Sequence, residues 1–211
     1  MIAILDYGVG NLFSLRSSLQ QLGLQAVVTA DADALRAADR LILPGVGAFG
    51  DAMAKLTATG LVPVLKEQAE EKPLLGICLG CQILLEHSEE NDMRTLGIVP
   101  GRCVRFPDHM KEEDGSPAPV PHMGWNSLEV VRPGRLLRGI EPGAEFYFVH
   151  SYYVEPAPEL VMATTIYGKE FCSVYGRDGL WAVQCHLEKS GRPGLAVLRN
   201  FYDYCDEVRH A

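Results

Sequence analysis

Residues 72–87 read KPLLGICLGCQILLEH, and this stretch decides both the fold and the chemistry to expect. It opens with a short apolar run, which is typical of a fully buried strand, and continues with residues at helical spacing. A buried strand that turns directly into a helix is the repeating unit of a parallel sheet. Cys78 and Cys81 lie at this turn. The first question is therefore which role a Cys-x-x-Cys pair has at such a turn.

The same alternation of strand and helix covers the first 90 residues. We expect strands at 2–5, 25–30, 40–45 and 73–78, and helices at 11–23, 32–38, 50–71 and 79–90, with a break at Pro63. Buried strands that alternate with helices predict an α/β fold with a mainly parallel sheet covered on both faces. Ligands of such sheets bind at the carboxyl ends of the strands.

The character of the chain changes at about Gly97. Segments 96–106 and 124–131 indicate antiparallel strands around a polar, Pro-rich stretch at 107–121. Further strands are expected at 145–156, 160–168, 171–176 and 180–188, and a last helix at 194–208. There is neither an internal repeat nor a linker long enough to separate domains. We therefore expect one domain over residues 1–211, with an antiparallel extension of the parallel sheet.

Composition narrows the class of protein. The 211 residues carry a net charge of −8 and are 47% hydrophobic, which argues against a nucleic-acid or anionic-membrane surface. No apolar run approaches the roughly 20 residues that cross a bilayer. The N-terminus has no basic segment of a signal peptide. Six cysteines are too few for a disulfide scaffold in a chain of this length, so a cytoplasmic location is expected.

Two glycine clusters invite a nucleotide interpretation. GVGAFG, residues 45–50, has the form of a dinucleotide fingerprint, but it follows the third strand and Pro44, and the next strand ends without an acidic residue. A tight turn is an alternative, and so is a set of backbone amides that bind an oxyanion. The second cluster, DYGVGNL, lacks the third glycine and indicates a turn in which Asn11 caps the first helix.

The cysteine pair has three interpretations. A zinc site needs three or four ligands, and the sequence has no second Cys-x-x-Cys and no His-x-x-x-His. A redox pair is harder to dismiss, because such motifs also begin helices that follow strands. The third interpretation is a nucleophile elbow, since Gly76 and Gly80 flank Cys78 as in G-x-S-x-G.

An elbow would give Cys78 the properties of a nucleophile. Gly76 and Gly80 would let neighbouring segments approach, and the helix starting at Leu79 would favour a thiolate at its N-terminus. The Leu79 amide is a natural oxyanion donor. Cys81 would then be a small packing residue.

A cysteine nucleophile needs a histidine base that a third group orients. His186 stands out because Glu188 follows two positions later, so a strand through 188 would place both side chains, with Gln184, on one face. Without the elbow, a surface His–Glu pair would be an equal alternative. We expect His87 to point away on the elbow helix. His109 and His210 lie in polar segments, and His150 lies in an aromatic strand without an adjacent carboxylate; His122 is the remaining candidate.

These residues resemble the class I, triad-type glutamine amidotransferases. GICLGCQ is similar to their nucleophile elbow, and VQCHLEKS to their His-x-Glu segment. DYGVGNLFSL, PGVGAFGDAM, VPHMGWN and YFVHSYY are similar, in order along the chain, to the amidotransferase subunits of imidazole glycerol phosphate synthase.

The resemblance implies a flavodoxin-like fold and hydrolysis of glutamine through a thioester on Cys78, with His186 as base and then acid, oriented by Glu188. It implies no cofactor and no metal. The ammonia would pass to a (β/α)8 cyclase subunit in a heterodimer that serves histidine biosynthesis. The implied oxyanion donors are the amides of Gly47 and Leu79. The implied glutamine-binding residues are Gln82, Glu90, Ser151 and Tyr152, and the implied interface residues are Asn11, Trp125, Tyr147 and Lys189.

Three residues depart from the family pattern. Cys81 stands where the family usually has Met, and Cys185 and Leu187 replace Phe and Pro around His186. Losing Pro frees the backbone between base and orienting group, so a looser triad is expected. Three other functions stay open: a paralogue that supplies ammonia to another synthase, a non-catalytic binding subunit, and an oxidoreductase that uses Cys78 and Cys81.

Overall fold

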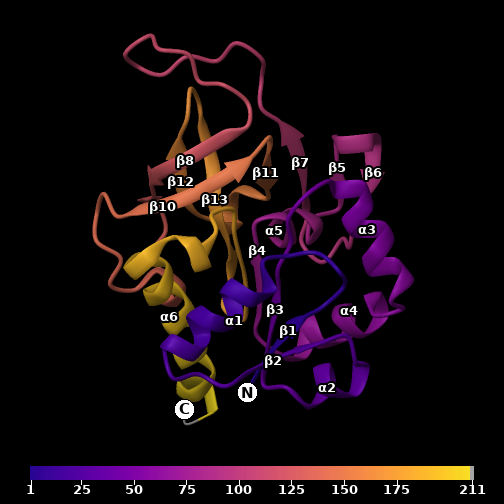
Figure 1. The fold of residues 1–211 in the computed structure, drawn as a ribbon. Helices are drawn as coiled ribbons and strands as arrows, with labels where there is room; N and C mark the ends of the chain where they lie inside the picture. Colours follow the sequence, from indigo (N-terminus) through magenta and orange to yellow (C-terminus); the bar gives the residue numbers. More distant parts are fainter. Residues whose placement is uncertain (210–211) are drawn as a thin grey trace.

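The computed structural model describes residues 1–209, and Figure 1 shows its ribbon. The helices are α1 Leu12–Gln21, α2 Ala32–Ala37, α3 Phe49–Ala58, α4 Val62–Glu71, α5 Leu79–Ile83 and α6 Gly191–Arg209. The strands of the first half are β1 Ile2–Leu5, β2 Ala26–Thr29, β3 Arg40–Leu43, β4 Leu74–Ile77, β5 His87–Ser88 and β6 Met93–Arg94. Those of the second half are β7 Gly101–Arg105, β8 His122–Ser127, β9 Glu129–Val130, β10 Glu145–His150, β11 Tyr152–Pro156, β12 Val161–Ile166, β13 Glu170–Arg177 and β14 Leu180–Val183.

One twelve-stranded sheet organises the molecule. Its main path is β2-β1-β3-β4-β14-β13-β11-β7-β5-β6, and the first five of these strands run parallel. The strands from β14 to β7 pair antiparallel. The expected α/β fold, a mainly parallel central sheet with an antiparallel extension, is confirmed.

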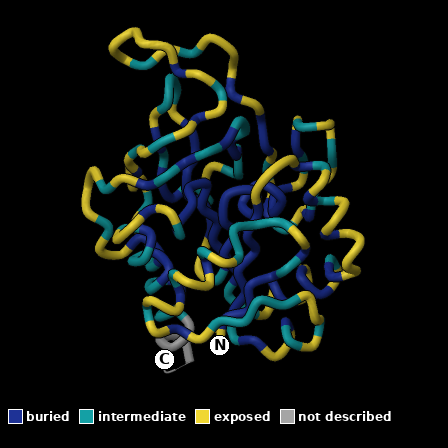
Figure 2. Tube along the Cα trace, viewed as in Figure 1, coloured by how far each residue is buried: buried dark blue, intermediate teal, exposed yellow. Residues whose placement is uncertain are grey.

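Alternate residues of the central strands face two separate cores. Ile2 and Ile4 pack with α1 and α6 on one face, and Ala3 and Leu5 pack with α2, α3 and α4 on the other. This alternation follows from the two-residue period of a strand. Both faces are covered, and Figure 2 shows buried residues concentrated along the sheet. The carboxyl ends of β3, β4 and β14 therefore lie at one edge, where ligands of parallel sheets bind.

Strands β7 and β8 flank the polar stretch and run in antiparallel pairs, as expected. They do not pair with each other, because β7 pairs with β11 and β8 pairs with β10. The strands β8 and β10 form a separate two-stranded sheet. The connecting residues 107–121 project from the body of the molecule as a largely exposed loop (Figures 1 and 2). A loop of this length lets the chain leave the main sheet before β8.

Three predicted boundaries were wrong. The stretch 50–71 forms two helices that break at Gly60, which has a positive φ of 71°, while Pro63 lies in the first turn of α4. The elbow helix ends at Ile83, so His87 lies on β5, not on that helix. The last strand ends at Val183, and residues Leu187–Lys189 form a 3-10 turn, η4.

Two further expectations concern membrane-spanning helices and the C-terminal histidine. No helix within residues 1–209 is long and apolar enough to cross a bilayer. His210, one of the histidines weighed from the sequence, lies outside the described residues.

Candidate active site

Cys78 occupies the sharp turn between β4 and α5. Its φ of 54° and ψ of −112° lie in a region that residues other than glycine rarely adopt. Its amide donates to the Val183 carbonyl at 2.8 Å, which ties the turn to β14. The Cys78 residue is only 5% exposed, and it borders a cavity. Strain of this kind is typical of a nucleophile that is held clear of its own backbone.

Gly76 and Gly80 make this turn possible. A Cβ on Gly80 would lie 1.9 Å from the Leu43 carbonyl oxygen, and a Cβ on Gly76 would lie 2.7 Å from Leu84 Cδ1. Real Cβ atoms do not approach other atoms so closely, so only glycine fits at either position. The prediction that these glycines let neighbouring segments approach is confirmed. We call residues 76–80 the elbow.

His186 reaches the elbow because β14 runs parallel to β4, with Val183 paired to Ile77. Three residues beyond Val183, the His186 amide donates to the Tyr147 carbonyl at 2.8 Å. The side chains of His186 and Glu188 are 2% and 3% exposed, and His186 Nδ1 lies 2.8 Å from Glu188 Oε1. The η4 turn brings the two together, and strand alternation does not, contrary to the sequence argument.

The protonation of His186 reflects both of its partners. Burial lowers its pKa, but the interactions of the ring with Cys78 and with Glu188 outweigh burial and raise the pKa to about 10. Nδ1 is bound to the carboxylate, whereas the buried Nε2 has no hydrogen-bond partner within the described residues. Nε2 is therefore the nitrogen left to exchange a proton with the sulfur or with substrate.

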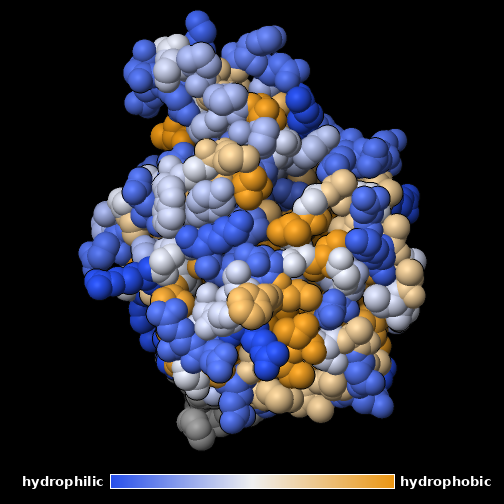
Figure 3. All heavy atoms as spheres, viewed as in Figure 1, coloured by the Kyte–Doolittle hydropathy of each residue, from blue (hydrophilic) through white to orange (hydrophobic). Residues whose placement is uncertain are grey.

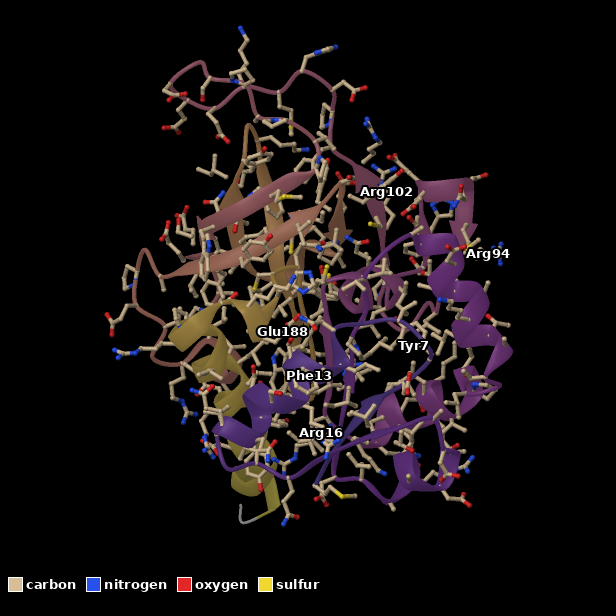
Figure 4. The ribbon with its side chains drawn as sticks, in the orientation of Figure 1. Tyr7, Phe13, Arg16, Arg94, Arg102 and Glu188 are labelled. Carbon is tan, nitrogen blue, oxygen red and sulfur yellow. The ribbon has the colours of Figure 1, made fainter. Side chains whose placement is uncertain are left out.

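A cavity of about 650 Å³ collects most of the residues singled out from the sequence. It is lined by Cys78, His186, Leu79, Gly47, Gln82, Glu90, Ser151, Tyr152, Asn11 and Lys189, among others. Glu188 lies behind His186 and borders a small adjoining crevice. Trp125 and Tyr147 do not line the cavity. Figure 4 shows Glu188 in the interior, beside the start of α1, which carries Phe13.

The two expected oxyanion donors are in different states. The Leu79 amide donates to the Gly45 carbonyl at 3.3 Å, so in this conformation it is not free for a ligand. Gly47 has a φ of 91°, and a Cβ placed on it would meet nothing within 4 Å. Only Gly45 of this turn is tightly packed, with the Tyr7 hydroxyl and Leu79 beside it. We call residues 44–48 the β3–α3 turn.

Two of the expected interface residues, Asn11 and Lys189, line the cavity, and Tyr147 and Trp125 lie next to Lys189. Trp125 is 53% exposed and its ring centroid lies 5.9 Å from that of Tyr147. Lys189 Nζ lies 5.3 Å from the centroid of the Tyr147 ring, which is within the range of a cation–π contact. Phe13, labelled in Figure 4, is 83% exposed, and Figure 3 shows apolar side chains gathered on the face that this view presents.

Asn11 occupies the N-cap position of α1, but its side chain makes no capping hydrogen bond. Instead, Asn11 Nδ2 donates to Glu188 Oε1 at 3.4 Å. The cap interpretation was right about the position and wrong about the side chain. The carboxylate of Glu188 thus has a second donor besides His186.

Sequence reasoning missed two residues near the cavity. His150 was treated as simply buried, yet it lines the cavity, its Nδ1 lies 2.7 Å from the Tyr152 carbonyl, and its Nε2 lies 3.1 Å from His122 Nδ1. Gln184 was placed near His186 but received no role, although its side chain contacts Cys78, Cys81 and Gln82. The only sequence signal for Gln184 was its position beside the predicted base.

Four other cysteines whose side chains the structure describes are buried. Cys81, Cys103, Cys172 and Cys185 are buried and free, and burial raises the pKa of each thiol. Among residues 1–209, no group of three His, Cys, Asp or Glu side chains is arranged to hold a metal ion. Leu187 is also buried, at 1% exposure.

A strained cysteine on a strand–helix turn and a buried His–Glu pair just beyond the end of the adjacent strand are the features of a class I glutamine amidotransferase. The class-I glutamine amidotransferase family model matches residues 3–205. Among solved structures, a glutamine amidotransferase superposes with a TM-score of 0.73 at 17% identity, covering 97% of this chain and 98% of that one. PurLQS from Thermotoga maritima gives 0.71 at 18% identity, covering 96% and 97%.

Sequence relatives narrow the family. The chain is 63% identical to the imidazole glycerol phosphate synthase subunit HisH of Desulfovibrio desulfuricans, over the whole of both chains. It is 48% identical to that of Methanothermobacter thermautotrophicus, over 96% of this chain and 98% of the relative. The chain therefore belongs to the HisH family of class I glutamine amidotransferases.

Proposed function

We propose that this chain hydrolyses glutamine to glutamate and ammonia, and delivers the ammonia to a cyclase subunit in histidine biosynthesis. One observation carries the proposal: Cys78 on its strained turn borders the same cavity as His186, whose other nitrogen is held by Glu188 at 2.8 Å. Family membership supplies the substrate class and the pathway.

Acylation begins with Cys78. Its thiolate attacks the side-chain carboxamide carbon of glutamine, and the carbon–nitrogen bond breaks to leave a glutamyl thioester. His186, protonated at Nε2 after taking the thiol proton, gives that proton to the departing nitrogen, which leaves as ammonia. Glu188 holds Nδ1 as the donor side of the ring, so that Nε2 faces the reaction.

Deacylation reverses the role of His186. The base removes a proton from water, the hydroxide attacks the thioester carbon, and the carbon–sulfur bond breaks to release glutamate. The amino-acid end of the substrate would contact Gln82, Glu90, Ser151 and Tyr152, which line the cavity. Glu90 supplies a negative charge suited to the α-ammonium group, and Ser151 and Tyr152 supply donors suited to the α-carboxylate.

The two oxyanion donors provide a way to couple glutamine hydrolysis to binding of the cyclase subunit. The Leu79 amide must exchange the Gly45 carbonyl for the substrate oxygen, and rotation of the β3–α3 turn would release it. Gly47, with free space around it, is suited to that rotation. We infer that a loaded cyclase subunit favours the rotated turn, which would prevent hydrolysis when no acceptor for ammonia is present.

The partner would be a (β/α)8 cyclase subunit that forms a heterodimer with this chain. Asn11, Trp125, Tyr147 and Lys189 lie at or near the mouth of the cavity, so a subunit seated on them would close it. A closed mouth keeps ammonia from solvent and directs it to the second active site.

Glutamate release from glutamine tests the proposal. The chain and its Cys78→Ala variant would be assayed alone and with a histidine-pathway cyclase subunit plus its nucleotide ligand. We expect release with the loaded cyclase that is lost in the variant. No release from a demonstrably formed complex would contradict catalysis, and the chain would then be a binding subunit. Ammonia transfer only to a different synthase would support the paralogue.

A further inference from the structure

The side chain of Gln184 is fully buried between Cys78 of the elbow and Cys81 of α5. Its Nε2 lies 3.9 Å from Cys78 Sγ, and its Oε1 lies 3.6 Å from Cys81 Sγ. The same Oε1 lies 3.0 Å from Gln82 Nε2. Neither the proton transfers nor the substrate contacts proposed above require this amide, so its burial beside the nucleophile calls for an explanation.

The orientation of the amide follows from a fixed acceptor. A carboxamide can be turned to exchange its nitrogen and oxygen, and only the hydrogen-bond network decides between the two. The Tyr152 carbonyl can only accept, so the Gln82 atom 3.0 Å from it is the nitrogen. That nitrogen also donates to Gln184, whose facing atom is therefore the oxygen. The NH2 group of Gln184 then faces Cys78.

This orientation treats the two cysteines differently. A nitrogen donor beside Cys78 favours the sulfur as an anion, because a thiolate accepts hydrogen bonds better than a thiol. An oxygen acceptor beside Cys81 favours that sulfur as an S–H donor, and burial also raises the pKa of Cys81. One amide thus makes Cys78 the reactive member of the Cys-x-x-Cys pair and keeps Cys81 as a thiol.

The Gln184 amide also holds the side chain of Gln82, which lines the cavity. Both N–H groups of Gln82 are taken, one by the Tyr152 carbonyl and one by Gln184. The oxygen of Gln82 is the atom left for a ligand, and an oxygen is suited to accept from the ammonium group of an amino acid. Without Gln184, the Gln82 amide would lose one of the two acceptors that hold it.

We propose that Gln184 is a positioning residue of the glutaminase site, which holds the Cys78 sulfur as an anion and fixes the Gln82 amide. The inference rests on the proposed function in one respect, the role of Cys78 as nucleophile. Gln184 itself exchanges no proton and does not line the cavity.

Two substitutions at Gln184 separate the hydrogen bonds from the packing. Gln184→Met keeps a side chain of similar length and removes both donor and acceptor. Gln184→Glu keeps an oxygen toward Gln82 and places a second oxygen toward Cys78. The matched control is Gln68→Met, since Gln68 is a buried glutamine on α4 that does not line the cavity.

The first readout is alkylation of Cys78 by iodoacetamide as a function of pH, followed site by site by peptide mass spectrometry. We expect the midpoint of the profile to rise by about one pH unit in Gln184→Met, and further in Gln184→Glu because its carboxylate opposes the thiolate. Gln68→Met should keep the wild-type midpoint. Melting temperatures measured in parallel show whether each variant is folded.

The second readout is glutamate release by the complex with the loaded cyclase subunit. In Gln184→Met we expect kcat to fall about tenfold from the weaker nucleophile, and KM to rise because Gln82 is less well held. A residue that only packed would lower the melting temperature and leave the alkylation midpoint in place.

The outcomes separate the inference from the proposed function. A folded Gln184→Met or Gln184→Glu variant with the wild-type alkylation midpoint would overturn the role of Gln184, whatever the turnover. If Gln184→Met fails to fold, the near-isosteric Gln184→Glu decides. Because alkylation needs no turnover, a wild-type complex that releases no glutamate would refute the proposed function and leave the measurement on Gln184 intact.

Discussion

Two glycine-containing turns follow neighbouring parallel strands and meet at the same cavity, yet they are built differently. In the elbow, a Cβ on Gly80 would lie 1.9 Å from the Leu43 carbonyl oxygen, so the turn has no room to move. In the β3–α3 turn, a Cβ on Gly47 would meet nothing within 4 Å, and the neighbouring Val46 is 37% exposed. The difference indicates that the nucleophile is held in place while the oxyanion donors can rearrange.

The largest expected effect comes from a change at Glu188, which lies outside both turns. It tests whether a nucleophile held in place is sufficient for activity. Glu188→Gln keeps the shape of the residue behind His186 but removes its charge, so the imidazolium loses its stabilisation. We expect glutamate release by the loaded complex to fall about 10³-fold, with the alkylated site still Cys78. A fall of less than about tenfold would mean that Asn11 or the elbow alone orients the base.

The stability of the two turns provides a direct comparison. Gly80→Ala forces the elbow away from Leu43 and should lower the free energy of unfolding by about 3 kcal/mol. Gly47→Ala pays only the strain of its left-handed φ of 91°, about 1 kcal/mol. Urea denaturation of both variants measures the difference. Equal losses would show that the two turns are equally constrained.

The freedom of Gly47 also predicts an effect on activity. An alanine is strained at the φ of 91° seen here, so Gly47→Ala favours other conformations of the β3–α3 turn. If the present conformation is the resting one, glutamate release without the cyclase should rise about tenfold. Gly60→Ala, which has a similar positive φ far from the site, serves as the control. Unchanged or lower basal release would show that the conformation of the β3–α3 turn does not keep the free chain inactive.

A smaller effect concerns the stability of the protein in acid, which depends on two buried histidines near the cavity. Burial lowers the pKa of His122 to about 4, and burial together with His122 lowers that of His150 to about 3. Unfolded histidines bind protons near pH 6.5, so between that pH and about 4 the unfolded chain holds more protons and stability falls as pH falls. The slope is up to about 1.4 kcal/mol per pH unit for each ring. Urea midpoints from pH 7 to 4 measure it.

His122→Phe is the matched test of that slope, because the ring of His122 stacks between Phe148 and Tyr167 and a phenyl ring can occupy its place. The acid loss of stability should become shallower in this variant. An unchanged slope would assign it to carboxylates elsewhere.

The smallest expected effect tests the alternative use of the cysteine pair. Cys81 is fully buried, and its thiol lies beside the Gln184 side-chain oxygen. Cys81→Met should keep glutamate release within about threefold, since Cys81 exchanges no proton and contacts no substrate in the proposed mechanism. An oxidoreductase that uses Cys78 and Cys81 would instead lose all activity, measured as disulfide reduction.

The sequence predicted most of the fold because its strands are apolar and short. The runs at 2–5, 40–43 and 74–77 can only be buried between two layers of helices, and that arrangement is what the structure has. The pairing of β7 and β8 could not be predicted, because residues 107–121 carry no signal that they leave the sheet. Pairing in antiparallel regions depends on side-chain packing between distant segments.

The candidate site was predictable in its residue types and less so in its geometry. Cys78 was identified from glycine spacing, and His186 from the carboxylate two positions later. The way in which these two approach was wrong, since η4 and not a continued strand brings Glu188 to the ring. Gln184 received no role because an amide acquires its meaning only from its neighbours, here Cys78 at the elbow and Cys81 and Gln82 on α5.

The adjacency of β4 and β14 has a consequence for how the protein is made. The nucleophile is synthesised early and the base late, and Gln184 is 106 residues beyond Cys78. A chain still on the ribosome, or one cut before β14, has a strand edge on β4 where Val183 should pair, and no histidine for its cysteine. Such long-range pairing forms late in folding. Ammonia production therefore requires that synthesis has passed Glu188 and that β14 has paired with β4.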